Sequence, residues 1–326
     1  MKDGCQRTID YLRVSVTDRC NLRCLYCMPK EGVTSLAHKD ILSYEEIIRL
    51  CRIVAGLGIK KVKLTGGEPL VRKNLSDLVA GIKAVPGIHE VTLTTNGVLL
   101  KKQLPGLLAA GLDAVNISLD TLDEKRYREI TRIGSLPDAM DGIFAAVGAV
   151  PAIPVKINCV PYFSDKENIV SMAGLAKKYP VHVRFIEMMP IGLGSLYGLC
   201  PEAKIKQVLS EAYGPLSESA RPLGNGPCRY YSIRGFAGKV GFISAISHKF
   251  CSGCNRVRLT ADGYLKTCLQ YDTGVGLKVL LRENKEDTEI ETAIKTAIFN
   301  KPVSHHFGAG AMAEKDEHLS MFQIGG

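Results

Sequence analysis

The sequence predicts an α/β fold, a partial (β/α)6 barrel of the TIM type that is closed by its C-terminal region. One observation is that β-rich and helix-periodic segments alternate six times over the first two-thirds of the chain, which implies parallel strands with helical crossovers. Another is that a cysteine loop, GGEP, TNG and Asp120 follow the first four strands in turn. Sites of parallel sheets lie at these strand ends. An open doubly wound sheet is the alternative, because its site lies there too.

Six segments rich in β-branched and apolar residues are the predicted strands. They are Tyr11–Val16, Lys60–Thr65, Glu90–Thr95, Ala114–Leu119, Val155–Val160 and Val181–Glu187. The predicted helices between them are Ser43–Ala55, Ser76–Ala84, Lys101–Ala110, stretches that reach about Val150, and Lys166–Tyr179. Ser43 and Glu46 have the spacing of a capping box, and Gly56 and Gly58 end the apolar pattern of that helix.

The pattern changes after about Pro190, where Gly- and Pro-rich loops begin. The elements expected beyond it are strands at Tyr230–Ile233 and Val240–Ile243, a hairpin that turns at Asp262–Gly263, and helices at Leu277–Glu283 and Thr288–Asn300. We therefore expect a barrel core at residues 1–190 and a C-terminal region at residues 191–326.

The composition favours a soluble protein with a sizeable core. The chain has 326 residues, of which 46% are apolar. The N-terminal segment has no apolar run of signal-peptide length, and no stretch approaches the length of a membrane span, so we expect a cytoplasmic protein with no membrane partner. The net charge is +9, the charges are dispersed, Trp is absent and aromatic residues make up 6%. This balance suits a phosphorylated small molecule and gives no support for a nucleic-acid partner.

Eleven cysteines are many for a protein in a reducing compartment, and their odd number argues against complete pairing. Six of them form two groups. The first group is Cys20, Cys24 and Cys27, and the second is Cys251, Cys254 and Cys268. The other five are expected to be small buried hydrophobes, and they are Cys5, Cys51, Cys159, Cys200 and Cys228.

Each group offers three thiolates, whereas a structural zinc site needs four ligands. No Cys or His close to the first group supplies a fourth ligand, and His38 is the nearest. A cubane iron–sulfur cluster usually takes four cysteines, so three cysteines leave one iron open to bind a small molecule. For the second group, the spacing leaves a cluster and a zinc ribbon both open, with His248 or Cys228 as the fourth zinc ligand.

The first group, with Tyr26 before its last cysteine, has the signature of the radical S-adenosylmethionine superfamily. Nearly the whole chain, from about Tyr11 to Gly326, resembles the GTP 3′,8-cyclase family, also called the molybdenum cofactor biosynthesis protein A family. The segments that carry this resemblance are LRVSVTDRCNLRCLYCMP, LTGGEPL, TTNG, NISLDTLD, VKINCV, RFIEMMPIG, CSGCNRVRLTADGYLKTCL and the terminal GG.

The resemblance implies a lyase with two [4Fe-4S] clusters, each with an open iron, and with S-adenosylmethionine as the other cofactor. The cluster on the first cysteine group would cleave S-adenosylmethionine to a 5′-deoxyadenosyl radical. The cluster on the second group would bind the guanine of GTP. The expected product is (8S)-3′,8-cyclo-7,8-dihydroguanosine 5′-triphosphate, formed in the first step of molybdenum cofactor biosynthesis.

The resemblance also implies the other site residues. The contacts expected for S-adenosylmethionine are Tyr26, Gly67, Ser118 and Met189. The contacts expected for GTP are Arg13, Lys63, Thr94, Lys156, Arg184, Arg256 and Arg258. Convergent cations suit a triphosphate, and a regular strand would turn Arg256 and Arg258 to the same side. Gly325 and Gly326 are expected to reach into the barrel and to be needed for catalysis.

The implied partners are GTP, a reductant such as flavodoxin or ferredoxin, cyclic pyranopterin monophosphate synthase as the consumer of the product, and a second copy of the chain in a homodimer. Two alternatives stay open. One is a twin-cluster radical S-adenosylmethionine enzyme that modifies a peptide, although such enzymes usually carry more C-terminal cysteines. The other is a non-catalytic electron-transfer or zinc-binding protein, which leaves the motifs at the strand ends unexplained.

Overall fold

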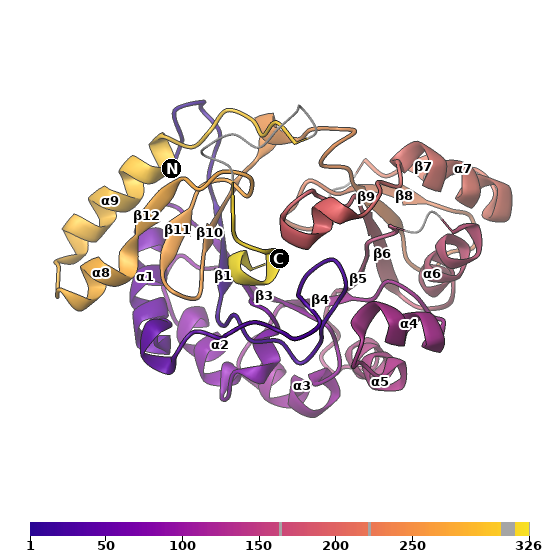
Figure 1. Cartoon of the computed structure of the whole chain (residues 1–326), viewed down its shortest axis with the longest axis horizontal. Coiled ribbons are helices and arrows are strands. Elements are labelled where there is room, and N and C mark those ends of the chain that lie inside the picture. Colours follow the sequence, from indigo (N-terminus) through magenta and orange to yellow (C-terminus); the bar gives the residue numbers. More distant parts are fainter. Residues whose placement is uncertain (163–164, 221–222, 308–316, 326) are drawn as a thin grey trace.

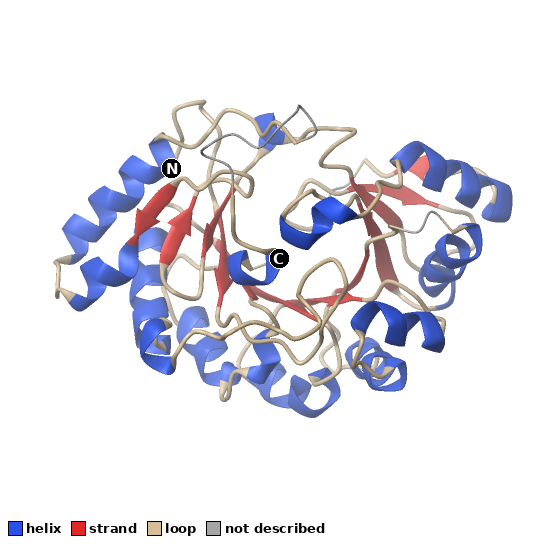
Figure 2. Cartoon of the chain, in the orientation of Figure 1, coloured by secondary structure: helices blue, strands red, loops and turns tan. Residues whose placement is uncertain are grey.

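The structure is a computed structural model that describes the chain except for residues 163–164, 221–222, 308–316 and 326. Its centre is one curved sheet (Figures 1 and 2) with the strand order β12-β11-β10-β1-β2-β3-β4-β5-β6-β9-β8-β7. The eight neighbouring strands from β10 to β9 are parallel. Short antiparallel strands extend the sheet at both edges.

The strands are β1 (Tyr11–Ser15), β2 (Lys61–Thr65), β3 (Glu90–Thr95), β4 (Ala114–Ser118), β5 (Val155–Cys159), β6 (Val181–Ile186), β7 (Ser217–Glu218), β8 (Arg229–Ser232), β9 (Val240–Ile243), β10 (Arg256–Leu259), β11 (Tyr264–Lys266) and β12 (Gly274–Gly276). The α-helices are α1 (Tyr44–Gly56), α2 (Leu75–Lys83), α3 (Leu100–Ala109), α4 (Glu124–Thr131), α5 (Leu136–Val147), α6 (Lys166–Lys178), α7 (Glu202–Tyr213), α8 (Leu277–Arg282), α9 (Asp287–Phe299) and α10 (Met321–Ile324).

The helices between the first six strands lie on the outer side of the curved sheet (Figure 2). A doubly wound sheet carries helices on both faces, whereas a barrel keeps them outside and leaves the inner face for the site. The predicted partial barrel is therefore confirmed, and the doubly wound alternative is wrong. All six predicted strands and the helices between them are present, with ends that differ by one or two residues.

Helix α1 shows how local sequence places these elements. The Glu46 backbone N–H donates to Ser43 Oγ at 3.1 Å, and the Ser43 N–H donates to Glu46 Oε2 at 2.6 Å. This is the predicted capping box. The buried face of the helix includes Ile47, Leu50 and Val54, spaced three and four residues apart so that they share one side of the helix.

The C-terminal half adds strands to both edges of the barrel. The predicted hairpin is confirmed as β10 and β11, and Gly263 in its turn has a φ of +83°, which favours glycine. The pairing of β10 with β1 and of β9 with β6 was not predicted. These strands are far apart in the sequence, so no local sequence pattern indicates that they pair. The division into residues 1–190 and 191–326 stays a prediction.

One helix was not predicted, and one expectation was wrong. Helix α7 lies between the two Gly- and Pro-rich stretches after Pro190, and its residues Ile205, Val208 and Leu209 are buried. Its helical spacing was hidden by the Gly- and Pro-rich stretches on both sides. Cys5 is exposed and Cys228 is only half-buried, whereas the other three scattered cysteines are buried as expected. Among the described residues, no helix is long and apolar enough to cross a membrane.

Candidate active site

A cavity of about 360 Å³ lies on the inner side of the barrel. It brings together nearly all of the predicted site residues that the structure describes. Those that line it are Arg13, Cys20, Cys24, Tyr26, Cys27, Lys63, Gly67, Thr94, Ser118, Lys156, Arg184, Met189, Cys251, Cys254, Arg256, Arg258 and Cys268. Gly325 contacts this set through Arg258. Gly326 lies outside the described residues.

The first cysteine group forms a turn directly after β1. The N–H groups of Cys27 and Met28 both donate to the Cys24 carbonyl at 3.0 Å, and Arg23 Nη1 donates to the Cys20 carbonyl at 2.8 Å. Burial raises the pKa of the Cys20 thiol to about 11 and that of the Cys27 thiol to about 12. Burial outweighs the opposite effect of the nearby Arg23 charge on Cys20, so these sulfurs need a bound metal to become thiolates at neutral pH.

Two glycines let β2 approach this loop closely. A Cβ atom on Gly66 would lie 2.6 Å from the Thr17 carbonyl oxygen, and one on Gly67 would lie 2.4 Å from the Arg19 carbonyl oxygen. The Gly67 N–H donates to Thr17 O at 2.7 Å. The glycines of the GGEP motif are therefore required by backbone packing, in addition to any ligand contact.

Buried carboxyl groups orient the polar side chains at the same end. The hydroxyl of Tyr26 donates to Asp120 Oδ2 at 2.6 Å, and the Val160 N–H donates to Asp120 Oδ1 at 2.8 Å. Glu68 accepts from the Thr95 hydroxyl at 2.7 Å. Burial raises the pKa of Asp120 to about 6 and that of Glu68 to about 7. Tyr26 is thus held by its hydroxyl with its ring at the cavity.

The second cysteine group lies at the opposite end of the strands. Cys254 precedes β10, which runs parallel to β1, whereas the first group follows β1. The hairpin brings Cys268 back beside β10, because the pairing of Arg258 with Lys266 sets Cys268 opposite Arg256. Five residues of β1 at about 3.3 Å each separate the two groups by roughly 16 Å.

The electrostatic surroundings of this second group differ from those of the first. Burial alone would raise the pKa of the Cys254 thiol, but the charges of Lys301 and Arg256 lower it to about 7. Cationic neighbours favour a thiolate. The second group is therefore prepared to hold a positively charged centre.

Between the two groups, three cations stand in a row on adjacent strands. Arg13 of β1 is in register with Arg258 of β10 and with Lys63 of β2, and adjacent strands are about 4.8 Å apart. Burial lowers the pKa values of Lys63 and Arg258 well below their usual range, and the neighbouring cations lower them further. Like charges in register are destabilising, so an anion bound beside Lys63 and Arg258 would stabilise this arrangement.

No ion pair between described residues includes Lys63 or Arg258. Lys156 and Arg184 add further positive charge from β5 and β6, and Arg184 Nε donates to Asn158 Oδ1 at 2.9 Å. Of the residues that line the cavity, seven are Lys or Arg and four are Asp or Glu. The cavity is thus suited to a polyanionic ligand.

The C-terminal segment lies on the inner side of the curved sheet (Figure 1), and its residues Met321 and Phe322 line the cavity. Phe322 and Ile324 are buried, and the Phe322 backbone lies near enough to Cys27 to oppose the effect of burial, which raises the pKa of that thiol. Three residues further on, the Gly325 carbonyl accepts from Arg258 Nη1 at 3.0 Å. The tail thus contacts both the first cysteine loop and the cation row.

The cysteines offer the donor set of cubane clusters. In such a cluster, each thiolate binds a separate iron corner. The six free thiols at the cavity wall, in two sets of three, offer the donor chemistry that two such clusters require.

Sequence reasoning missed two residues of this site. Asn158 lies two residues after Lys156 on β5, and this period-two spacing predicts that both face inward. That signal was available. Lys301, beyond α9, reaches the cavity and donates from Nζ to the Arg256 carbonyl at 3.1 Å. The sequence around Lys301 does not indicate this contact, because its hydrogen-bond acceptor is 45 residues away.

The cationic interior predicts a pH effect on stability at His182. Its Nδ1 accepts from the Lys239 N–H at 3.2 Å, and burial, with Lys156, Lys239 and Arg184, lowers its pKa from 6.5 to about 4. Between pH 6.5 and pH 4, His182 is therefore protonated in the unfolded chain but neutral in the folded chain. The free energy of unfolding falls as the pH decreases through this range.

Thermal unfolding measured between pH 4 and pH 8 should show a shallower acid decline for His182→Gln than for the wild type. His89 is exposed, so His89→Gln serves as the control and should keep the wild-type slope. Equal slopes for wild type and His182→Gln would contradict the assignment of this acid sensitivity to His182.

Comparison with known proteins agrees with this geometry. Residues 14–173 match the Radical SAM superfamily, and residues 181–307 match the family described as Molybdenum Cofactor Synthesis C. GTP 3′,8-cyclases of Pelotomaculum thermopropionicum and Moorella thermoacetica are 48% and 47% identical over 330 residues, covering all of each chain. The structure of Streptococcus suis SuiB bound to S-adenosylmethionine has a TM-score of 0.57 at 14% identity, covering 91% of this chain and 65% of SuiB, and so shares the fold. The chain therefore belongs to the GTP 3′,8-cyclase family of the radical S-adenosylmethionine superfamily.

Proposed function

We propose that this chain converts GTP into (8S)-3′,8-cyclo-7,8-dihydroguanosine 5′-triphosphate, the first step of molybdenum cofactor biosynthesis. The observation that carries the proposal is the row of buried cations between two three-cysteine groups. A triphosphate carries several negative charges and so complements these cations. The relatives at 48% and 47% identity carry the name of this activity.

Cys20, Cys24 and Cys27 hold one [4Fe-4S] cluster, and the second cysteine group holds the other. When bound, the clusters and S-adenosylmethionine would supply the 5′-deoxyadenosyl radical that removes hydrogen from carbon 3′ of the ribose, and one further electron and a proton would complete the product after this carbon bonds to carbon 8 of guanine. The residues of this chain position the two carbons of GTP and exclude water.

The contacts with S-adenosylmethionine come from the strand ends next to the first cysteine group. They are Tyr26, Gly67, Ser118 and Met189, all at the cavity wall. Tyr26 is oriented by its hydrogen bond to Asp120, so its ring is fixed before the cofactor binds. Fixed side chains of this kind lower the entropic cost of binding.

The contacts with GTP come from the middle of the cavity and from its second end. They are Arg13, Lys63, Thr94, Lys156, Arg184, Arg256 and Arg258. Arg258 serves two partners, because it also donates to the Gly325 carbonyl. Gly325 and Gly326 act in catalysis by bringing backbone groups, without side chains, next to the substrate.

The remaining parts of the proposal concern partners and location. A flavodoxin or ferredoxin supplies the electron, cyclic pyranopterin monophosphate synthase takes the product, and the chain acts as a homodimer in the cytoplasm. Residues 1–190 form the barrel core, and residues 191–326 carry the second cluster and the tail.

An anaerobic assay tests the proposal. The chain is reconstituted with iron and sulfide, then mixed with S-adenosylmethionine, dithionite and GTP, and 5′-deoxyadenosine and the nucleotide product are followed by mass spectrometry. The expected result is GTP-dependent 5′-deoxyadenosine together with the cyclised nucleotide. Formation of 5′-deoxyadenosine with no GTP product would reject GTP as the substrate, and zinc without iron in the protein would reject the radical chemistry.

A further inference from the structure

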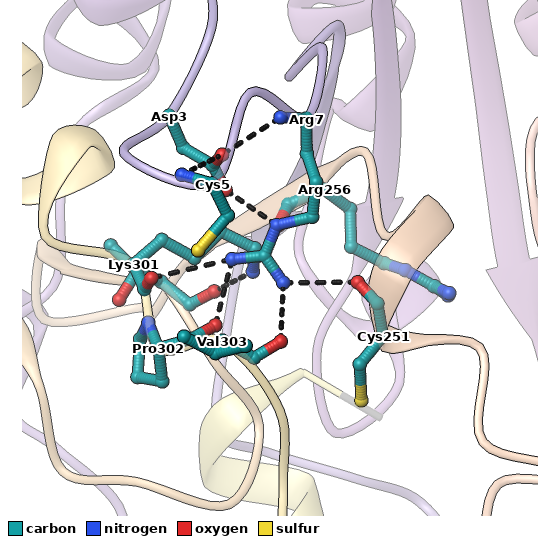
Figure 3. Close-up of polar contacts among 9 residues, drawn as sticks. Asp3, Cys5, Arg7, Cys251, Arg256, Lys301, Pro302 and Val303 are labelled. Atoms are coloured by element: carbon teal, nitrogen blue, oxygen red, sulfur yellow. Dashed lines mark hydrogen bonds and ion pairs between the residues drawn. The ribbon is translucent and has the colours of Figure 1, made fainter.

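We propose that Arg7 and Lys301 are positioning residues for the second cluster, holding its two cysteine loops through buried hydrogen bonds to the backbone. The two residues come from opposite ends of the sequence and lie close together (Figure 3), where Arg7 Nη2 donates to the Lys301 carbonyl. Arg7 is 7% exposed and Lys301 is 5% exposed. The inference rests on the proposed function, because it takes Cys251, Cys254 and Cys268 as the ligands of that cluster.

Every N–H of the Arg7 guanidinium has an acceptor. Nε donates to Asp3 Oδ2 at 2.6 Å, and this carboxylate is itself fully buried. The acceptors of the two terminal nitrogens are the backbone carbonyls of Cys251 at 2.9 Å, Val303 at 2.8 Å, Lys301 at 3.3 Å and Pro302 at 2.7 Å. One side chain thus ties the N-terminal segment to the first cysteine of the group and to the segment after α9.

The carbonyl of Cys251 is the one that closes the turn of the C-x2-C motif. It accepts from the Cys254 N–H at 3.2 Å as well as from Arg7. A fixed carbonyl at this position restricts the backbone of both cysteines. Arg7 therefore acts on the geometry of the pair without touching either sulfur.

Lys301 secures the rest of the group. Its Nζ donates to the carbonyl of Arg256, two residues after Cys254, and to the carbonyl of Thr267, directly before Cys268. Together the two cations make backbone bonds within two residues of all three sulfurs. The cysteines come from separate segments, so a device that joins the segments is needed to hold three sulfurs at the spacing of a cluster.

The charges around Arg7 and Lys301 also support a role in positioning the second cluster. The charge of Arg7 is offset by Asp3, but Lys301 has no carboxylate within ion-pair distance in the described part of the chain. The groups that interact favourably with its ammonium are the thiols of Cys254 and Cys268. A buried cation that lacks an opposite charge is destabilising, even where its ammonium is hydrogen-bonded to backbone carbonyls. A cluster bound by three thiolates would place compensating negative charge beside it.

The test uses Arg7→Met and Lys301→Met, with Arg282→Met as a matched control. Arg282 also bridges backbone carbonyls, those of Lys39 and Ile41, but it lies on α8 and does not line the cavity. Each protein is reconstituted anaerobically. Iron per chain, the low-temperature electron paramagnetic resonance spectrum after reduction, and cleavage of S-adenosylmethionine without GTP are then measured.

The wild type and Arg282→Met are expected to bind about eight irons, four per cubane. Arg7→Met and Lys301→Met are expected to bind about half of that iron and to lose the signal of one cluster. They should still cleave S-adenosylmethionine, because the first cluster is retained. Full iron content and a wild-type spectrum in both variants would overturn the inference.

A second measurement covers variants that fold poorly. Arg7→Lys keeps the charge but has three donors in place of five, so it cannot serve all of the carbonyls. Iron release to a chelator should show a phase about tenfold faster in Arg7→Lys than in Arg282→Met, and equal rates would reject the role of Arg7. If the wild type itself binds only about four irons, the second cluster, and with it the proposed function, fails instead.

Discussion

Replacing Lys63 by methionine is expected to stabilise the protein and to weaken GTP binding at the same time. Lys63 is 8% exposed, stands in register with Arg13, and has no carboxylate partner among the described residues. Burial, together with Arg184, Arg13 and Lys156, lowers its pKa well below the usual value. The buried charge of Lys63 therefore lowers the free energy of unfolding, and the negative charge of a bound triphosphate would offset this effect.

The gain in stability and the loss of GTP affinity expected for Lys63→Met can be measured separately. An apolar side chain of similar length should raise the free energy of unfolding by about 1–3 kcal/mol, since removal of buried charge is often stabilising by this amount. Loss of one charged contact should weaken GTP binding about 10- to 100-fold. Thermal unfolding without nucleotide gives the first quantity, and equilibrium binding of GTP to the reconstituted enzyme gives the second.

Two variants provide controls for Lys63→Met. Lys63→Arg keeps the charge, so it should gain no stability and should retain most of the affinity. Lys166 is exposed and pairs with Glu211 at 2.7 Å, so Lys166→Met should change the free energy of unfolding by less than about 0.5 kcal/mol. Lower stability of Lys63→Met with unchanged GTP affinity would show that Lys63 serves the fold and that the cation row is not a phosphate site.

The parts of the site that lie on predicted strands could be placed from the sequence. The inward positions of a strand alternate, so the faces of Arg13, Lys63 and Lys156 follow from the strands, although these residues were first expected at the site from the family resemblance. The cysteine loop and the GGEP motif were placed by the rule that sites lie at the carboxyl ends of parallel strands. The hairpin between β10 and β11 placed Cys268 beside Cys254 for the same local reason, because Asp262–Gly263 defines its turn.

The contacts that join distant segments could not be predicted in this way. Arg7 meets Cys251 and Val303 across almost the full length of the chain, and an arginine near the N-terminus gives no local indication of such partners. The same holds for Arg258 and the Gly325 carbonyl, which are 67 residues apart. Hydrophobic periodicity describes single elements, whereas these bonds depend on how the elements are packed together.

Gly325→Ala is expected to abolish most GTP cyclisation while leaving both clusters in place. Gly325 has a φ of +81°, and an added Cβ atom would lie 2.6 Å from Thr65 Oγ1 and 3.0 Å from Ser15 Cβ. The backbone strain alone costs about 1–2 kcal/mol, and the steric conflict adds to it. The tail must therefore shift, and the hydrogen bond between the Gly325 carbonyl and Arg258 is lost.

The rate of cyclised-nucleotide formation should fall at least about tenfold in Gly325→Ala, because a displaced tail also displaces Arg258. Iron content and cleavage of S-adenosylmethionine without GTP should stay at wild-type levels, since the cysteines are unchanged. Gly235 provides a control, because its φ is +80° and an added Cβ atom would meet nothing within 4 Å. Gly235→Ala also places a side chain at a positive φ, but it meets no conflict inside the cavity. A wild-type rate in Gly325→Ala would mean that the tail packs in the barrel without taking part in the reaction.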